Sequence, residues 1–520
     1  MTTISHPFRV LGVTCVAVLL VAIDNLLINV ALPSFAIDLH ASSTSLQWIV
    51  DGYSLPFAAL MLAGGGLADR YGRRRVMLSG LAAFTLCSLF AASVHSVSGL
   101  ITARAMMGAS AAFIFPATLS IVTVTFTDAR QRANALGIWG ATVGAAIAIG
   151  PVAGGAILAH FWYGAIFLLN VPLGVIAFAL VFFVVPESRS PQRERFDGVG
   201  LALGTVGLTA LTLAIIEGPV WGWFGVGTLI TFVLAATLLI GFVWYELRTA
   251  HPLFDVRIYR SRAFSAGALA ITTNFFLLFG FIFLITQYFQ LVRGYSPLSA
   301  GLRTLPFSGV VVVTTPLGAL LAARIGARYV VPLGLLTMAG ALTWMSVQSP
   351  SAAYLGPVVG SMMLLALGFS LISAPSTAVT MAVVEPHQIG SGAAVNETNR
   401  ELGGTLGVAV IGSVFASIFG PAVHHLFAPY LHHGLTPEVL ALAQSSMQAA
   451  MVVVHHLPVA LQAHAHQTVV NAFMDGLHRS CLVAAAVGAL GAVVTFRALP
   501  SGRLGRETAG DDQGRTSPRR

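Results

Sequence analysis

Long apolar runs separated by short polar turns make up most of the chain. Fourteen of these runs are long enough to be membrane-spanning helices, since about 20 apolar residues cross a bilayer. The pattern therefore predicts an all-α integral membrane protein. We expect its helices over residues 8–33, 46–68, 75–95, 98–126, 133–160, 164–186, 198–218, 225–246, 263–290, 298–323, 328–348, 352–383, 401–420 and 476–497.

The first run has the position of a signal peptide. However, it is about 25 residues long, which exceeds the apolar core of such a peptide, and it lacks a small-residue cleavage site. It also contains Asp24. We therefore expect residues 8–33 to be a membrane span.

Arginine is distributed unevenly between the two sides of this topology. With the N-terminus inside, the external loops hold only Arg293, Arg303 and Arg479, and Arg104 alone lies well inside a span. All other arginines, including Arg400, then fall in cytoplasmic segments, as the positive-inside rule requires. We expect a multi-pass protein of the cell (inner) membrane with both termini in the cytoplasm.

The composition supports a membrane protein and disfavours a soluble enzyme. Of the 520 residues, 56% are hydrophobic and 9% are charged, and the mean hydropathy is +0.84, whereas soluble chains are about 25% charged. The net charge of +8 could indicate a nucleic-acid partner. Because the arginines lie in short loops between apolar runs, we expect the lipid bilayer as the partner and no nucleic acid.

The chain contains no lysine, since all 27 basic residues are arginines. A Walker A loop and Schiff-base chemistry both need lysine, so the chain carries no ATPase domain of that kind. Transport would draw on a gradient or on a separate ATPase subunit. Cys15, Cys87 and Cys481 are isolated, and no HExxH or GxSxG motif occurs. We therefore expect no disulfide, no metal site, no cofactor and no enzymatic activity.

Two turns of the chain resemble each other. Residues 67–73 and 321–327 agree at four of seven positions, and each segment joins two predicted spans. Eight spans separate the two copies, as expected if two helices are inserted between two six-helix repeats. Such repeats around a midplane site are typical of secondary transporters, although one short match could arise by chance.

The polar stretch Pro186–Asp197 marks the end of the first six spans, and Arg248–Arg262 follows the eighth. Residues 451–461 are too short to cross the membrane, so we expect them at its outer surface. The resulting organisation is an N-terminal bundle (8–186), two inserted helices with linkers (187–262), a C-terminal bundle (263–497) with an external loop (421–475), and a disordered cytoplasmic tail (498–520).

Several motifs resemble those of the major facilitator superfamily, and some resemble its fourteen-span drug:proton antiporter branch (EmrB/QacA type). The resemblance covers nearly the whole chain outside the external loop and the tail, but it says little about the substrate. Met107 stands where the family usually has Gln. The matching segments are Asp24–Pro33, Gly65–Arg75, Leu100–Gly108, Gly150–Gly155, Phe167–Gly174, Gln287–Pro306 and Asn399–Gly407.

This resemblance implies a major facilitator fold with 14 transmembrane helices and a proton-coupled exporter of hydrophobic or cationic small molecules, working as a multidrug efflux antiporter by alternating access. The partners would be a small-molecule substrate and protons. Alternatives are a dedicated exporter of an endogenous metabolite or lipid, and a non-transporting sensor with the same fold.

Asp24 and Arg104 are the candidate proton-coupling residues. Asp24 lies about 15 residues, roughly 22 Å, into the first span and thus near the middle of the bilayer, where ionisable groups mark ion paths or proton relays. Arg104 stays charged and needs a partner inside the bundle, so it could bias Asp24. The resemblance also implicates Asp24 in proton coupling. Structural roles in capping or pinning helices are the alternatives.

Two further motifs are gating candidates. The cytoplasmic gate motif comprises Gly65, Asp69, Arg70, Gly72, Arg73 and Arg74, whose charges could pair across the two halves in one conformation only. The second copy carries Ala323 in place of Asp69, so this latch would be asymmetric. The antiporter motif comprises Gly140, Gly144, Gly150, Pro151, Gly154 and Gly155, where small residues would let another helix approach closely.

A substrate cavity is the remaining expectation. Aromatic faces can hold flat or cationic compounds, although the phenylalanine stripe could equally face lipid. Asp51 and Glu217 should lie near the outer ends of their spans, where either could attract a cation, but we expect both on solvated faces. We expect no close pair of carboxylates within the membrane. The external histidines, which include His424, His425 and His478, match no zinc template. The cavity candidates are Asn25, Asn29, Asn274, Phe275, Phe279, Phe283 and Gln287.

Overall fold

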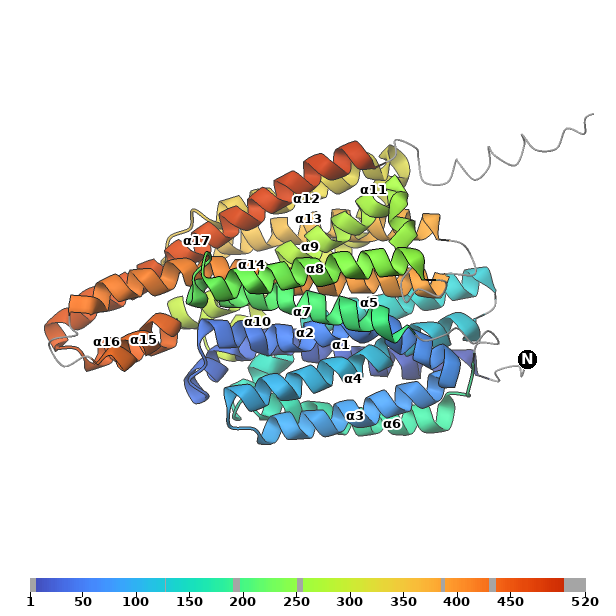
Figure 1. Cartoon of the computed structure of the whole chain (residues 1–520), viewed down its shortest axis with the longest axis horizontal. Coiled ribbons are helices and arrows are strands. Elements are labelled where there is room, and N and C mark those ends of the chain that lie inside the picture. The colour runs from blue at the N-terminus through green and yellow to red at the C-terminus, as the bar shows by residue number, and fades with distance from the viewer. Residues whose placement is uncertain are drawn as a thin grey trace, which may run out of the picture.

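The long helices run side by side along one axis of the molecule in the computed structural model (Figure 1). α1 (Pro7–Asp38) begins and α17 (Val459–Ala498) ends at one end of this bundle, which we call the terminal end. α15 (Pro437–Ser445) and α16 (Met447–His456) project from the opposite, distal end. The structure describes residues 6–126, 128–189, 197–249, 256–384, 389–429 and 436–499, in which every regular element is helical.

Six helices form the first bundle: α1, α2 (Ser43–Tyr71), α3 (Arg73–Ser93), α4 (Val97–Thr125), α5 (Ala129–Leu158) and α6 (Ala165–Val184). Ser42, Ser96 and Asp128 precede α2, α4 and α5, and each side chain accepts a hydrogen bond from a backbone N–H three residues later. These caps satisfy donors that a helix start leaves free. α1 packs against α4, α5 and α6, and α3 packs against α4 and α6.

The second bundle repeats this packing. Its elements are α9 (Arg262–Gln287), η2 (Tyr288–Val292), α10 (Pro297–Leu302), α11 (Leu305–Ile325), α12 (Ala327–Met345), η3 (Tyr354–Val358), α13 (Val359–Val383), α14 (Ile389–Phe427) and α17. α9 packs against α13, α14 and α17, and α12 packs against α13 and α17. The two bundles therefore pair equivalent helices, in agreement with the repeat in the sequence.

The repeated turns end equivalent helices. Gly72 ends α2 with φ of 116°, and Gly326 ends α11 with φ of 95°. Side chains other than hydrogen rarely tolerate such positive φ values. The shared glycine of the two segments thus has a conformational reason in both bundles.

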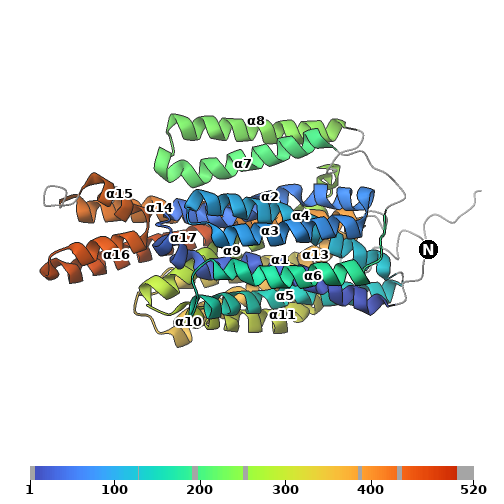
Figure 2. The ribbon, with the colours of Figure 1, turned by 90° about the horizontal axis from the view of Figure 1, so that it is seen from below.

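The inserted helices α7 (Gly198–Trp221) and α8 (Val226–Arg248) form a hairpin outside the two bundles (Figure 2). α7 packs against α2 of the first bundle and α14 of the second, whereas α8 packs mainly against α7. A short helix, η1 (Val256–Arg260), leads from the hairpin to α9. The hairpin therefore covers the line where α2 meets α14.

The distal region is more helical than the expected external loop of residues 421–475. α14 has 39 residues and α17 has 40, so each is about 60 Å long and exceeds the thickness of a bilayer. The predicted spans 401–420 and 476–497 are only parts of these helices, because polar residues continue the helices beyond the apolar runs. Residues 451–461 lie in the end of α16 and the start of α17.

Among the described residues, 12 helices are long and apolar enough to cross a membrane, and 13 if the two parts of α2, bent by 50°, count as one span. α12, with 19 residues, is not among these helices but packs between α13 and α17. A count of 14 spans therefore remains a prediction. The expected disorder of residues 498–520 falls almost wholly outside the described residues.

Candidate functional site

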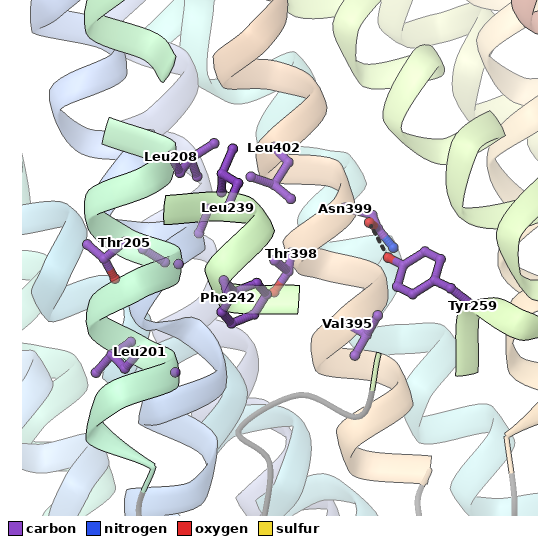
Figure 3. Close-up of a pocket in the computed structure, with 14 residues that line it drawn as sticks. Leu201, Thr205, Leu208, Leu239, Phe242, Tyr259, Val395, Thr398, Asn399 and Leu402 are labelled. Atoms are coloured by element: carbon purple, nitrogen blue, oxygen red, sulfur yellow. Dashed lines mark hydrogen bonds between the residues drawn. The ribbon is translucent and has the colours of Figure 1, made fainter. Parts of the chain in front are cut away.

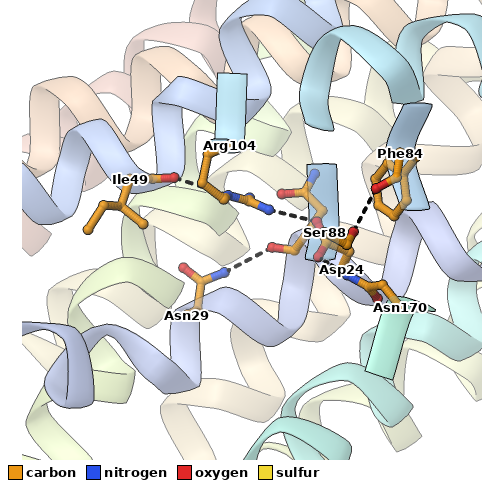
Figure 4. A network of polar contacts seen from close by, with 8 residues as sticks. Asp24, Asn29, Ile49, Phe84, Ser88, Arg104 and Asn170 are labelled. Carbon is orange, nitrogen blue, oxygen red and sulfur yellow. Dashed lines mark hydrogen bonds and ion pairs between the residues drawn. The ribbon is translucent and has the colours of Figure 1, made fainter. Parts of the chain in front are cut away.

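A buried polar cluster joins helices of the first bundle (Figure 4). Arg104 Nη1 on α4 donates to Asp24 Oδ2 on α1 at 2.6 Å, and Asn170 Nδ2 on α6 donates to Asp24 Oδ1 at 2.6 Å. Arg104 Nε donates to the carbonyl oxygen of Ile49 on α2 at 3.2 Å. The side chains of Asp24 and Arg104 are 2% and 0% exposed. Each carboxylate oxygen therefore has a donor, and the cluster links four helices.

The Arg104 guanidinium also lies over the ring of Tyr53, with Cζ 4.2 Å from the ring centroid. Arg104 Nη2 has no hydrogen-bond partner among the described residues. Burying such a pair is expensive, and removing one member leaves an unpaired charge that is more expensive still. The geometry brings Asp24 and Arg104 together, as their proposed mutual influence requires, while their role in coupling stays a prediction.

The two bundles enclose a central cavity of about 250 Å³. α1, α2, α4 and α5 line it from the first bundle, and α9, α11, α13 and α14 line it from the second. Trp139, Phe57 and Phe115 supply aromatic walls. Because both repeats contribute to this cavity, it has the placement expected of a transporter's binding site.

Three charged residues of α14 line the central cavity: Glu397, Arg400 and Glu401. Arg400 Nη1 is 2.7 Å from Glu397 Oε1, and Arg400 Nη2 donates to Thr377 Oγ1 at 3.3 Å. The Arg400 Cζ lies 5.5 Å from the ring centroid of Phe275. The Glu401 carboxylate makes no hydrogen bond to any described residue. Among the described residues, the cavity therefore contains one ion pair and one carboxylate that accepts no hydrogen bond.

Two expectations about α14 were wrong. Arg400 lies within the bundle rather than in a cytoplasmic loop, because α14 begins at Ile389, well before the predicted start at residue 401. Glu397 and Glu401, one helical turn apart, form the close pair of carboxylates that the sequence analysis did not expect. Their i, i+4 spacing beside the Asn399–Gly407 motif was the signal that could have found them.

Only some of the predicted cavity residues line the central cavity. Asn274 instead donates to the carbonyl oxygen of Phe369 at 3.5 Å, and Gln287 donates to that of Phe283 at 2.8 Å. Both side chains are therefore hydrogen-bonded to the backbone within the second bundle. Asn29 lines a smaller neighbouring cavity of about 40 Å³. Asn25, Phe275 and Phe279 line the central cavity, whereas Asn29, Asn274, Phe283 and Gln287 do not.

The antiporter motif divides into two parts along α5. A Cβ on Gly150 would lie 2.9 Å from Leu26 Cβ, and one on Gly154 would lie 3.0 Å from Leu27 Cγ, so these glycines permit close packing on α1. Gly140 and Gly144 have no such neighbour within 4 Å and line the cavity instead. The expected close helix approach is thus absent at these two glycines.

The bundles meet at the distal end. A Cβ on Gly155 would lie 2.5 Å from the carbonyl oxygen of Pro297 on α10, and Gly301 packs against Pro151. Gln290 Nε2 donates to the carbonyl oxygen of Val30 at 2.8 Å, which joins η2 to α1. These contacts close the central cavity toward the distal end.

The gate motif at the terminal end has partners in its own bundle. Asp69 Oδ1 is 2.7 Å from Arg73 Nη2, and Arg74 donates to the carbonyl oxygen of Phe182. Glu187, which follows α6, accepts a hydrogen bond from the backbone N–H of Arg74 at 3.2 Å. Among the described residues, this motif makes no hydrogen bond or ion pair to the second bundle. Glu187 was not predicted, since it lies in the interbundle linker.

Asp51 does not lie on a solvated face, which corrects the expectation, whereas Glu217 lines a wide cavity at the distal end. Asp51 is 0% exposed. Glu217 is half-buried, and its Oε1 accepts a hydrogen bond from Trp48 Nε1 at 3.0 Å. Asp51 is on α2, a helix that packs against both α7 and α14.

The distal end has a wide cavity of about 890 Å³ between α2, α7, α14 and α15. His424 and His425 line it together with Glu217. In the part of the chain that the structure describes, no cluster of His, Cys, Asp and Glu could hold a metal ion. His432 and His433 lie outside the described residues.

A third cavity, of about 190 Å³, lies on the side of the molecule under the hairpin (Figure 3). Leu201 and Leu208 of α7 and Phe242 of α8 form one wall. Val395 and Leu402 of α14 lie across from them. These α14 residues are on the face of the helix opposite Glu397 and Glu401, so α14 separates the lateral cavity from the central one.

Comparison with known proteins decides the family. A family model described as "Major Facilitator Superfamily" matches residues 14–408. The chain belongs to the major facilitator superfamily. It is therefore a member of a transporter family rather than an enzyme, and its many apolar helices make it a multi-pass membrane protein.

Related major facilitator proteins are drug resistance and efflux proteins. The chain is 36% identical over 405 residues to the multidrug resistance protein Stp of Mycobacterium tuberculosis, which covers 78% of this chain and 75% of Stp. It is 34% identical over 489 residues to the multidrug efflux pump LfrA of Mycolicibacterium smegmatis, with 93% and 94% covered. These relatives place the chain among major facilitator multidrug efflux transporters.

The fold matches solved transporters. A bacterial homologue of the human lysosomal transporter Spinster, in an inward-facing and unoccupied conformation, aligns with a TM-score of 0.66 at 17% identity, covering 95% of this chain and 97% of that one. A D-xylose–proton symporter aligns with a TM-score of 0.60 at 13% identity, covering 96% and 99%. At such identities, these structures show the common fold alone.

Proposed function

We propose that this transporter exports hydrophobic or cationic small molecules in exchange for protons. The observation that carries the proposal is the Asp24–Arg104 pair, which is buried in the first bundle beside the central cavity. Asn25, the next residue of α1, lines that cavity. A proton that reaches Asp24 neutralises its charge and releases Arg104 from the pair, so protonation rearranges helices that also touch the substrate.

In the conformation described above, we infer that the central cavity is accessible from only one end of the molecule. The distal contacts of Gly155 and Gln290 close one end of the cavity, whereas the gate motif at the terminal end makes no hydrogen bond or ion pair to the described residues of the second bundle. We assign the terminal end to the cytoplasm and the distal end to the outside of the cell (inner) membrane, with both termini inside and 14 spans. The arginine bias supports this assignment.

The central cavity supports a substrate that is apolar with a positive charge. Trp139, Phe275 and Phe279 offer ring faces, and Glu401 offers a carboxylate that accepts no hydrogen bond from the described residues. Aromatic faces and a carboxylate both attract a cation in a low-dielectric site. Several relatives are named for resistance to drugs, and one is the methyl viologen resistance protein SmvA of Salmonella typhimurium.

The energy of a proton gradient is sufficient for this exchange. For a neutral substrate, one proton that moves down a potential of 100 mV supplies about 2.3 kcal/mol, and each pH unit adds about 1.36 kcal/mol. Exchange of one proton for one monovalent cation moves no net charge, so the pH difference alone drives it. One proton per molecule then supports a concentration gradient of about tenfold for every 1.4 kcal/mol. No ATPase domain is required.

The test uses inverted membrane vesicles that hold a proton gradient and a pH-sensitive dye. Adding a transported cation should release protons from vesicles with the wild-type protein, and Asp24→Asn should abolish this release while leaving the protein in the membrane. Glu438→Gln, which removes an exposed carboxylate of α15, is the matched control. Release that persists in Asp24→Asn would refute the assignment of coupling to Asp24.

A dedicated exporter of an endogenous lipid-like compound is the second candidate. The lateral cavity favours it, because its walls of leucine, valine and phenylalanine, which lie between the hairpin and α14, suit a lipid-like compound. Growth of cells with and without the protein on a broad panel of toxic compounds separates the candidates. A dedicated exporter would alter susceptibility to none of them.

A further inference from the structure

Asp51 is a buried carboxyl group that the proposed mechanism does not use. It is 0% exposed, and neither Oδ1 nor Oδ2 has a hydrogen-bond partner among the described residues. An ionised carboxylate in such a place costs several kcal/mol, because it loses its hydration and gains no partner. The enclosed conformation therefore favours the neutral, protonated carboxyl group.

Asp51 lies near the contact between α2 of the first bundle and α14 of the second, which we call the seam. Gln47, one helical turn earlier, is on the same face of α2. A Cβ on Gly412 would lie 2.6 Å from Gln47 Cδ, and Ser413 Oγ donates to Gln47 Oε1 at 3.4 Å. That face of α2 thus contacts α14 of the second bundle. Asp51 is about 12 Å along α2 from its distal start at Ser43, within the contact that must open for release at the distal end.

None of the described charged groups on neighbouring helices pairs with the Asp51 carboxyl group. Asp24 and Arg104 are occupied with each other, and Glu217 is held by Trp48. On α14, Glu397 pairs with Arg400, and Glu401 faces the central cavity. Nothing in the described surroundings would stabilise a negative charge on Asp51 while α2 and α14 are in contact.

We propose that Asp51 makes the contact between α2 and α14 at the distal end, the distal seam, dependent on a bound proton, and we call this device a latch. With the bundles apart at the distal end, Asp51 is hydrated and exchanges its proton with the distal solution. Only the neutral carboxyl group can be enclosed, so α2 closes on α14 after a proton has bound. The same proton returns to the distal solution when the seam reopens. It is therefore distinct from the proton that Asp24 would carry.

This inference rests on alternating access in the proposed function, but it has its own measurable consequence. Closure that takes up one proton becomes about tenfold less favourable for each unit of pH above the pH at which hydrated Asp51 ionises. A low distal pH then favours the distally closed conformation described here. This is the conformation in which an exporter would load its substrate from the terminal end.

The test measures the distal seam directly in the purified full-length protein. Spin labels at Thr44 on α2 and Ala416 on α14, both of which line the distal cavity, report the separation of the helices by double electron–electron resonance. The three native cysteines are first replaced by alanine. The ratio of close to separated label pairs should fall by up to tenfold per pH unit in the wild type. Asp51→Asn should remain in the close state at every pH, and Asp51→Glu should retain a pH dependence.

A wild-type label distance that does not change with pH would overturn the proposal, and so would an Asp51→Asn protein that keeps the wild-type dependence. An Asp51→Asn protein that fails to fold would also overturn it, since the closed seam should accommodate the neutral amide. Asp24→Asn should keep the pH dependence of the label distance. If proton release in vesicles fails while this dependence persists, the export proposal is wrong and the latch stands.

Discussion

Two charged clusters of this transporter each combine an arginine with a carboxylate, but they lie in different surroundings. Asp24 and Arg104 are enclosed in the first bundle, and both carboxylate oxygens have donors. Glu397 and Arg400 border the central cavity with side chains that are 13% and 21% exposed, and Glu401 beside them has no hydrogen-bond partner among the described residues. The enclosed cluster depends on internal pairing, whereas the cavity cluster has capacity left for a ligand.

This comparison separates stability from recognition. A charge enclosed by four helices cannot lose its partner without a large cost in folding free energy. A charge at a cavity can be solvated, so its removal affects binding more than folding. The predictions below test whether the two clusters differ in this way.

The largest effect is expected from Arg104→Leu. This change leaves Asp24 buried without its cationic partner, so stability should fall by about 3–5 kcal/mol, and compound-dependent proton release should disappear. Combining it with Asp24→Asn removes both charges and should recover much of the stability but none of the transport. Thermal unfolding of the purified proteins and vesicle assays measure these effects. Equal stability of the single and double variants would mean that the pair is not an enclosed unit.

A smaller loss is expected from Asn170→Ala. This change removes one hydrogen bond to a buried carboxylate, and such bonds contribute about 1.5–3 kcal/mol. Thermal unfolding should show the loss. Ser88→Ala is the matched control, because the buried Ser88 hydroxyl donates to the carbonyl oxygen of Phe84 in its own helix and to no other described residue. If both variants lose the same stability, Asn170 contributes packing rather than a bond to charge.

The smallest effect on the fold is expected from Glu401→Gln. The affinity for a monovalent organic cation should fall about tenfold, or about 1.4 kcal/mol, while that for a neutral compound of similar shape should not change. Fluorescence titration of the purified protein measures both. Glu438→Gln removes the same charge from an exposed position on α15 and should leave both affinities unchanged. Parallel losses for the cation and the neutral compound would place Glu401 in a structural role.

Much of the architecture could be predicted from the sequence. The apolar runs, the two glycine turns and the family motifs indicated a helical transporter built from two related bundles. Helix ends were predicted less well, because α14 and α17 continue through polar residues that a membrane criterion excludes. Because the predicted span began at residue 401 whereas α14 begins at Ile389, Arg400 was predicted in a loop and its pair with Glu397 was not predicted.

The site was predicted unevenly for a related reason. Asp24 and Arg104 were found because an ionisable residue in the middle of an apolar run is conspicuous. Asn274 and Gln287 were equally conspicuous, but each bonds to a backbone carbonyl oxygen in the second bundle. Hydropathy shows that a polar side chain is within the membrane, but it does not show which face of the helix carries it.

The sequence by itself determined where the long apolar helices lie, the repeat that relates the bundles and the membership of a transporter family. These depend on hydrophobicity, turn glycines and short motifs, all of which are local properties. Only the tertiary structure decided that Arg104 meets Asp24, that Glu401 faces the cavity and that Asp51 is enclosed at the seam. Each of these depends on how distant helices are rotated against one another, because the partner of a buried charge comes from another helix.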